Sequence, residues 1–154
     1  MDIYQALKSD HDAQRRLIEI IQKTHAGSEG RRDLFTRLHR ELISHATTED
    51  RVFYAALLAE PPTHDIVRHS VSEHEEIEEI LDELAHRDPG EQGWMNRFHT
   101  LAERLEHHLR EEESAVFRAA ASVLSGPEAE RLARSYAAMK SHEKSAVDAA
   151  PLSS

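Results

Sequence analysis

The chain has 154 residues, a net charge of −10 with histidine counted as neutral, and no cysteine. This length suits one domain with a core of its own, and the lack of cysteine excludes disulfides, zinc–thiolate sites and thiol nucleophiles. The acidic balance argues against nucleic acid as a partner, because a basic surface would be expected for that role.

Four groups of helix-breaking residues divide the chain, at 25–30, 60–65, 87–93 and 125–127. The segments between them have helical periodicity, so we predict helices over about 2–25, 31–59, 63–86, 93–124 and 127–146. Asp2 and Thr63 are the predicted N-caps of the first and third helices. The sequence therefore predicts an all-α protein.

The predicted location of the protein follows from two further features of the sequence. Its first residues, MDIYQALKSDHD, lack the basic and apolar regions of a signal peptide. No apolar run approaches the roughly 18 residues that a membrane span requires. We therefore expect a cytoplasmic protein that does not interact with a membrane.

Polar residues interrupt the apolar stripe of each long helix, where leucine would be the simplest choice. The six interrupting residues are His11, His45, Glu49, His74, His108 and Glu112. After the two glutamates the stripe is predicted to continue through Val52 and Ala56, and through Ala115 and Ala119. His107 lies about 100° round its helix from His108, on the expected solvent side.

The sequence also repeats itself when it is shifted by 63 residues. The stretch SDHD (9–12) then falls on SEHE (72–75), and the pair His45 and Glu49 falls on His108 and Glu112. Two helical hairpins of like design, packed about a pseudo-twofold axis, would bring four helices together. The six polar residues would then meet in the middle of the bundle.

A buried carboxylate costs several kcal/mol unless it is paired or binds a metal. His and Glu four residues apart lie on the same helix face, so each HxxxE pair can bind one ion or two neighbouring ions. Nitrogen and oxygen ligands without sulfur suit iron, manganese or zinc. We prefer two ions bridged by both carboxylates, each ion also holding two imidazoles and solvent.

Four stretches resemble the hemerythrin-like family, in its HHE cation-binding branch: KSDHDA, ELISHATTEDRVFY, HSVSEHEEI and LEHHLREEESAVF. The resemblance covers about residues 3–120 and implies an up-down-up-down four-helix bundle, followed here by a short fifth C-terminal helix. The expected domain then spans residues 1–146, with its core in 3–120 and its C-terminal helix in 127–146, and 147–154 form a flexible tail.

The resemblance also implies a cofactor, two non-haem iron ions with an oxo or hydroxo bridge. His11, His45, His74 and His108 would be terminal ligands, and Glu49 and Glu112 bridging ligands. Oxygen-carrying hemerythrins have a further histidine one turn from that of the third helix, but here Ser70 and Glu78 occupy those positions. Fewer imidazoles favour a reactive or sensing centre over an oxygen carrier.

Three functions remain open at this point. The first is an enzyme that decomposes peroxide or another reactive oxygen or nitrogen species, with Tyr54, Glu78 and His107 as candidate acid–base residues. The second is a non-catalytic protein that binds, stores or senses dioxygen, nitric oxide or iron. The third is a structural bundle that holds zinc or manganese. The sequence does not indicate an oligomeric state.

Overall fold

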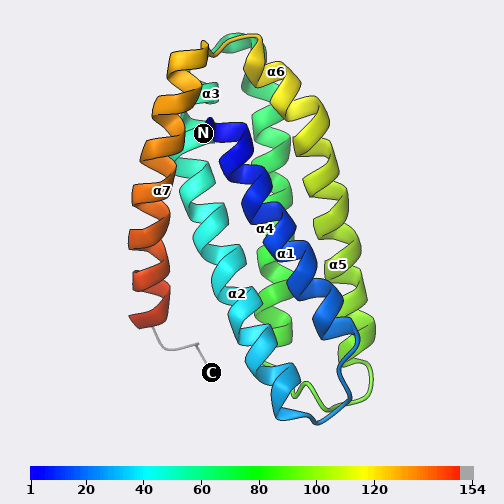
Figure 1. Cartoon of the computed structure of the whole chain (residues 1–154). Helices are drawn as coiled ribbons and strands as arrows, with labels where there is room; N and C mark the ends of the chain where they lie inside the picture. The colour runs from blue at the N-terminus through cyan, green and yellow to red at the C-terminus, as the bar shows by residue number, and fades with distance from the viewer. Residues whose placement is uncertain (150–154) are drawn as a thin grey trace.

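The structure, a computed structural model, describes residues 1–149. The long helices are α1 (Ile3–Gln22), α2 (Glu29–Glu49), α4 (His64–Ala85), α5 (Trp94–Glu111) and α7 (Gly126–Ala149). The shorter elements are η1 (Asp50–Tyr54), α3 (Ala55–Leu58), η2 (Pro61–Thr63), η3 (Glu112–Val116) and α6 (Phe117–Ala121). Helices α1, α2, α4 and α5 run up and down as a four-helix bundle, and α7 packs against α1 and α2 (Figure 1). The predicted all-α fold is confirmed.

The two predicted N-caps behave differently. Asp2 accepts a hydrogen bond from the Gln5 amide, and the Gln5 side chain accepts one from the Asp2 amide, which completes a capping box at the start of α1. Thr63 occupies the N-cap position of α4, but its hydroxyl donates to the carbonyls of Leu57 and Glu60 instead. Thr63 therefore fastens the preceding loop rather than capping the helix.

Each HxxxE pair is followed by a π-helical turn, η1 after Glu49 and η3 from Glu112 onward. The regular helical spacing of the sequence predicted uninterrupted α-helices there, and that prediction was wrong. A π turn adds one residue to the helical turn, so the buried stripe moves on by one position. Val116 and Ala120 are buried where Ala115 and Ala119 were predicted.

The same shift follows η1, where Leu57 is buried in place of the predicted Ala56. Tyr54 also becomes buried at this point, five residues after Glu49. The π turns thus change which residues are buried after each HxxxE pair, whereas the buried stripe before each pair is that of an ordinary α-helix.

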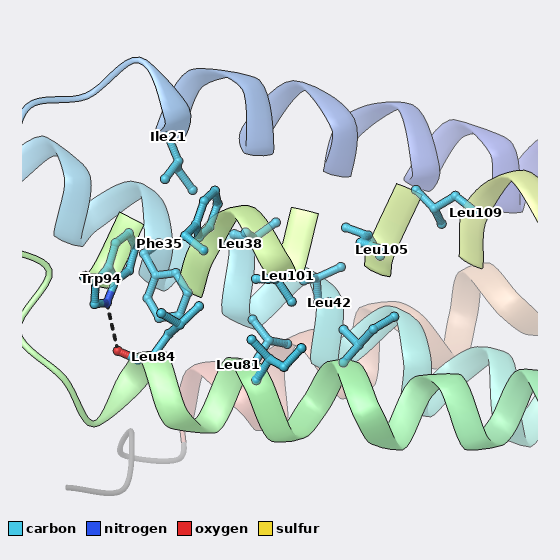
Figure 2. Close-up of a cluster of buried hydrophobic side chains, with 13 residues drawn as sticks. Ile21, Phe35, Leu38, Leu42, Leu81, Leu84, Trp94, Leu101, Leu105 and Leu109 are labelled. Atoms are coloured by element: carbon cyan, nitrogen blue, oxygen red, sulfur yellow. Dashed lines mark hydrogen bonds between the residues drawn. The ribbon is translucent and has the colours of Figure 1, made fainter. Parts of the chain in front are cut away.

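Two clusters of buried apolar side chains lie above and below a polar middle layer of the bundle. One cluster, shown in Figure 2, gathers residues such as Phe35, Leu84 and Phe98 around Trp94, whose indole NH donates to the Leu84 carbonyl over 3.2 Å. The other gathers residues such as Leu7 and Phe53 near the opposite end. Apolar packing on both sides keeps water away from the middle layer, which contains the six polar stripe residues.

The C-terminal helix is longer than predicted. Helix α7 covers Gly126–Ala149 rather than 127–146, so the helix includes the first three residues of the predicted tail; the rest of that tail lies outside the described residues. Ser125 and Glu128 exchange side-chain-to-amide hydrogen bonds, a capping box that fixes the start of α7. In the part of the chain that the structure describes, no helix is both long and apolar enough to span a membrane.

Candidate metal centre

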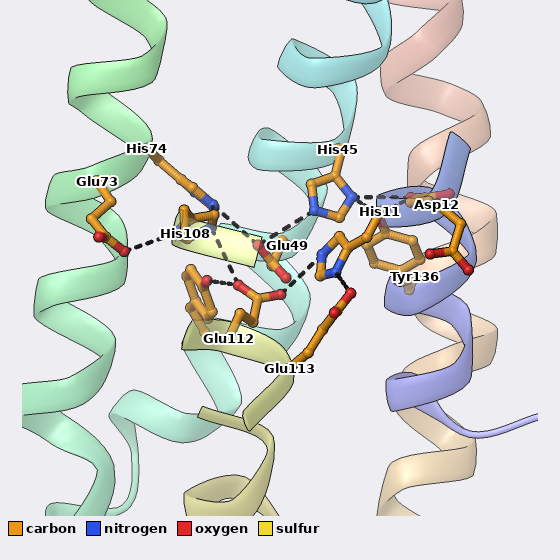
Figure 3. Close-up of polar contacts among 12 residues, drawn as sticks. His11, Asp12, His45, Glu49, Glu73, His74, His108, Glu112, Glu113 and Tyr136 are labelled. Carbon is orange, nitrogen blue, oxygen red and sulfur yellow. Dashed lines mark hydrogen bonds and ion pairs between the residues drawn. The ribbon is translucent and has the colours of Figure 1, made fainter. Parts of the chain in front are cut away.

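All six polar stripe residues lie buried together in the middle layer (Figure 3). They form two groups whose ligand atoms lie within 4.8 Å of one another: His11, His45, Glu49 and Glu112 in one, Glu49, His74, His108 and Glu112 in the other. The two groups share both carboxylates. The Nε2 atoms lie 3.1–3.5 Å from these carboxylates: His11–Glu112 3.3 Å, His45–Glu49 3.5 Å, His74–Glu49 3.1 Å and His108–Glu112 3.4 Å.

Several inward-facing atoms of this cluster make no hydrogen bond within the described chain. They are Nε2 of His11 and His45, both carboxylate oxygens of Glu49, and Oε1 of Glu112. An unpaired buried carboxylate is costly, on the order of several kcal/mol. A cation between the groups would satisfy these atoms, and imidazole nitrogens with carboxylate oxygens are ligands that iron, manganese and zinc accept. The cluster is therefore able to hold metal.

The outward nitrogen of each imidazole contacts a second carboxylate. The Nδ1 distances are 2.8 Å for His11–Glu113, 3.0 Å for His45–Asp10, 3.0 Å for His74–Asp50 and 2.8 Å for His108–Glu73. Such carboxylate partners hold the ring orientation and the tautomer that leaves Nε2 free for a metal. Neither Asp10 nor Asp50 was predicted from the sequence to have this role.

The repeat in the sequence could have revealed these two residues. A shift of 63 residues places Asp10 on Glu73 and Asp50 on Glu113. Each hairpin therefore supplies the same two outer carboxylates as the other. The repeat appears in space as a pseudo-twofold arrangement of the whole centre, with its outer carboxylates included.

The symmetry fails at one aromatic pair. The Tyr54 hydroxyl donates to the Glu112 carboxylate, and the ring stacks on His74 with centroids 5.4 Å apart. Its repeat equivalent, Phe117, stacks on His11 at 6.4 Å but has no hydroxyl to offer Glu49. One of the two shared carboxylates therefore has a phenol donor and the other does not.

The other two acid–base candidates lie farther out. The His107 side chain is 70% exposed and contacts Glu111 at 3.2 Å on the surface. Glu78 is also exposed and belongs to neither group, although it lines a small pocket that reaches His45 and His74. Of the three candidates, the structure brings only Tyr54 into contact with the six buried residues.

Helix α7 reaches the centre from one side, which the sequence analysis did not predict. The Tyr136 hydroxyl donates to Asp10 and lies 2.6 Å from Nδ1 of His45. Lys140 pairs with Asp10 at 2.7 Å and with Glu41 at 2.5 Å. The group that contains His11 and His45 thus has a support that its symmetry partner lacks.

The electrostatics of the metal-free centre favour protonated imidazoles. Burial alone would lower the pKa of His11, but Glu112 and Glu113 outweigh it and raise that pKa to about 9. Burial likewise opposes the charge on His74, and Asp50 and Glu49 raise its pKa to about 10. Because metal binding requires neutral imidazole, a cation must displace these protons.

These pKa values predict how the stability of the metal-free protein depends on pH. The folded state keeps protons on His11 and His74 that the unfolded chain, with a histidine pKa of about 6.5, releases. This stabilisation is complete below pH 6.5 or so and is lost as the pH rises through about 9 and 10. Urea unfolding in chelator should therefore show an unfolding free energy that falls by several kcal/mol between pH 6.5 and 9.5.

The control for this experiment is His11→Gln, which should flatten the slope because it removes one of the imidazoles with a raised pKa. An unfolding free energy that rises over the same interval would contradict the assignment of protons to these imidazoles.

Comparisons with known proteins agree with this geometry. The family model of the hemerythrin HHE cation binding domain matches residues 2–120, which end just before α7. A crystal structure of a hemerythrin HHE cation binding domain-containing protein from Mycobacterium kansasii matches with a TM-score of 0.86 and 27% identity, covering 95% of this chain and 89% of that one. A DNA nickase from Nostoc sp. is 25% identical over 144 residues, which are 92% of this chain and 40% of the nickase.

The family match spans more than half of the chain and includes all six buried ligand candidates. This chain covers well under two thirds of the length of the nickase, which is 25% identical to it. Its similarity to the Mycobacterium kansasii protein, by contrast, extends along nearly the whole of both chains. The protein therefore belongs to the hemerythrin HHE cation-binding family.

Proposed function

We propose that the chain is a non-haem di-iron protein that reacts with small oxidants, namely peroxide, dioxygen or nitric oxide, in the handling of oxidative or nitrosative stress. The observation that carries the proposal is the pair of buried carboxylates shared by two imidazole groups, with three of their four oxygens making no hydrogen bond within the described chain. His11 and His45 would hold one ion, His74 and His108 the other, and Glu49 and Glu112 would bridge them. Iron bound there would supply one-electron redox chemistry and sites for a small ligand.

The residues of the chain itself have three tasks in this proposal. The outer carboxylates fix the imidazole rings, so that Nε2 stays directed inward. The Tyr54 hydroxyl donates to Glu112 and holds a proton there, because burial and the charge of Glu112 raise the pKa of the phenol well above its ordinary value. The apolar clusters above and below exclude water.

A small pocket beside the centre supports a small substrate. Its volume is about 30 Å³, and its walls include Gln14, His45, His74 and His108 among apolar side chains. A cavity of this size holds roughly two water-sized atoms, which suits a diatomic molecule or peroxide. The Gln14 side chain is fully buried, and neither amide atom is hydrogen-bonded to the described chain.

We expect Gln14→Ile to stabilise the protein and weaken ligand binding. Its repeat equivalent is Ile77, so isoleucine is already used at the matching place in the other hairpin. Removing an unpaired buried amide should raise the unfolding free energy by about 1 kcal/mol or more. Loss of the amide donor should weaken azide binding to the iron-loaded protein about tenfold, measured by optical titration. A variant that is less stable and binds azide as tightly would contradict this role.

The test of the proposed function is anaerobic loading of chelator-treated protein with Fe²⁺, followed by metal quantitation and peroxide addition. We expect two irons per chain and rapid oxygen evolution, which His45→Ala should abolish. Iron content well under one per chain would refute the metal centre. Two irons without oxygen evolution, but with a lasting coloured adduct of dioxygen or nitric oxide, would favour the second candidate, a non-catalytic binding, storage or sensing protein.

A further inference from the structure

A second cluster of histidine and glutamate lies on the surface, between α4 and α5. It consists of His69 and Glu73 on α4, and His107 and Glu111 on α5. Each helix contributes one His–Glu pair four residues apart, and the antiparallel helices set the two pairs side by side. The ligand atoms of His69, Glu73 and Glu111 lie within 4.8 Å of one another. None of these four residues belongs to the six of the buried centre.

The spacing within this surface cluster matches that of ligands around one ion. Nε2 of His69 lies 3.4 Å from Glu73 and 3.4 Å from Glu111. A tetrahedral ion with bonds of about 2.0–2.2 Å separates its ligand atoms by roughly 3.3–3.6 Å. Nε2 of His107 lies 3.2 Å from Glu111 and 3.8 Å from Glu73. Because the His107 side chain is 70% exposed, it can rotate to supply a fourth ligand.

The charges in the surface cluster also suit a divalent cation. Both of its carboxylates are paired with histidines, whereas the nearby glutamates Glu76 and Glu106 are paired with arginines. An imidazole nitrogen can bind a metal ion, but an arginine guanidinium has no acceptor atom with which to do so. Two carboxylates and two neutral imidazoles balance the charge of one divalent ion.

Glu73 connects this surface cluster to the buried centre. Its Oε2 faces His69 at 3.4 Å, while its Oε1 lies 2.8 Å from Nδ1 of His108. The side chain of Glu73 is mostly buried, with 14% exposed, so it stands between the solvent and the centre. One carboxylate thus contacts both a surface ligand candidate and an imidazole of the buried pair.

We propose that His69, Glu73, His107 and Glu111 form a surface site for a single divalent transition-metal ion, from which the buried centre is loaded. The surface site stands on its own geometry and does not require the proposed reaction with oxidants. The surface site would take up its ions from solution, and Glu73 contacts both the surface site and the buried centre.

Binding of Zn²⁺ tests the site. Full-length protein without a histidine tag, with its centre already filled with iron, should bind one further Zn²⁺ with micromolar affinity in calorimetry. The double variant His69→Ala/His107→Ala should weaken that binding at least tenfold. The matched control, His25→Ala/His142→Ala, removes two exposed histidines elsewhere and should bind as the unaltered protein does. Absence of the extra Zn²⁺, or equal binding by both variants, would overturn the site.

The rate of iron uptake tests the loading role. Metal-free His69→Ala/His107→Ala should take up Fe²⁺ at least fivefold more slowly than the control variant, and both should reach the same final iron content. Equal uptake rates would overturn the loading role. The final iron content separates this outcome from failure of the buried centre, because a protein without that centre would retain no iron at any time.

Discussion

Replacing Glu112 with glutamine is expected to cost the protein both buried metal ions rather than one. Glu112 belongs to both ligand groups, and its two oxygens face different imidazoles, Oε1 toward His11 and Oε2 toward His108. Glutamine keeps the shape but removes the charge and directs an NH₂ donor at one of the two positions. We expect metal affinity to fall by more than the roughly 10–100-fold cost of losing an outer-shell partner.

The measurement is iron per chain after anaerobic loading and desalting, which should drop from two to well under one. The matched control is Glu103→Gln, an exposed glutamate on α5, the helix that leads into η3, and this variant should retain both ions. His74→Gln provides a contrast, because His74 belongs to one group only and its loss should release one ion. If Glu112→Gln still held one ion tightly, this carboxylate would serve a single metal and the bridged arrangement would be wrong.

The expected difference in iron content between Glu112→Gln and His74→Gln depends on two residues whose inward positions the sequence alone predicts. Helical periodicity places His74 and Glu112 on inward stripes, and the shift of 63 residues shows that each has an equivalent in the other half of the chain. Burial depends mainly on which face of a helix a residue occupies, and that face follows from spacing. For this reason all six central residues could be predicted to meet.

The outer carboxylates were harder to find because their contacts depend on the relative rotation of neighbouring helices. Asp10 stands next to His11 in the sequence, yet it contacts His45 across the bundle. Glu113 likewise stands next to Glu112 but contacts His11. Neighbours along a helix lie about 100° apart, so the partner of an off-stripe residue is set by packing between helices. Spacing within one helix carries no such information.

The π turns were missed for a related reason. A π turn changes the helical period for one turn only, and the residues on either side keep a regular pattern. After Glu112 the small residues Ala115 and Ala119 fit a buried stripe nearly as well as Val116 and Ala120 do. Only the packing of the neighbouring helices distinguishes the two registers. The π turns begin at Asp50, directly after Glu49, and at Glu112, and the extra residue in the first of them brings Tyr54 close to Glu112.

The side of the centre that faces α7 should be the more sensitive to mutation in that helix. Tyr136 is buried, packs within the apolar cluster that contains Leu7 and Phe53, and bonds Asp10 through its hydroxyl. Removing the ring in Tyr136→Ala leaves a cavity, and the cost for a buried aromatic residue is about 3–5 kcal/mol. Urea unfolding of the metal-free protein should show a loss of this size.

Tyr136→Phe isolates the hydroxyl from the ring. Asp10 keeps its pairing with Lys140, so the expected loss of stability is about 1 kcal/mol. The metal result should be asymmetric, because Asp10 holds His45 and no contact of Tyr136 reaches His74 or His108. The ion proposed at His11 and His45 should bind about tenfold more weakly, as for other outer-shell losses. Titration against a competing chelator should then separate two binding steps.

The control for Tyr136→Phe is Tyr4→Phe. The Tyr4 hydroxyl is buried and makes no hydrogen bond within the described residues, so its removal should not lower the unfolding free energy and should leave metal binding close to that of the unaltered protein. If Tyr136→Phe weakened both ions equally, the hydroxyl would act on the bundle as a whole. If it weakened neither, the contact between α7 and Asp10 would not support the centre. An effect on one ion alone would show that α7, which lies outside the residues matched by the family model, gives two otherwise similar metal positions different affinities.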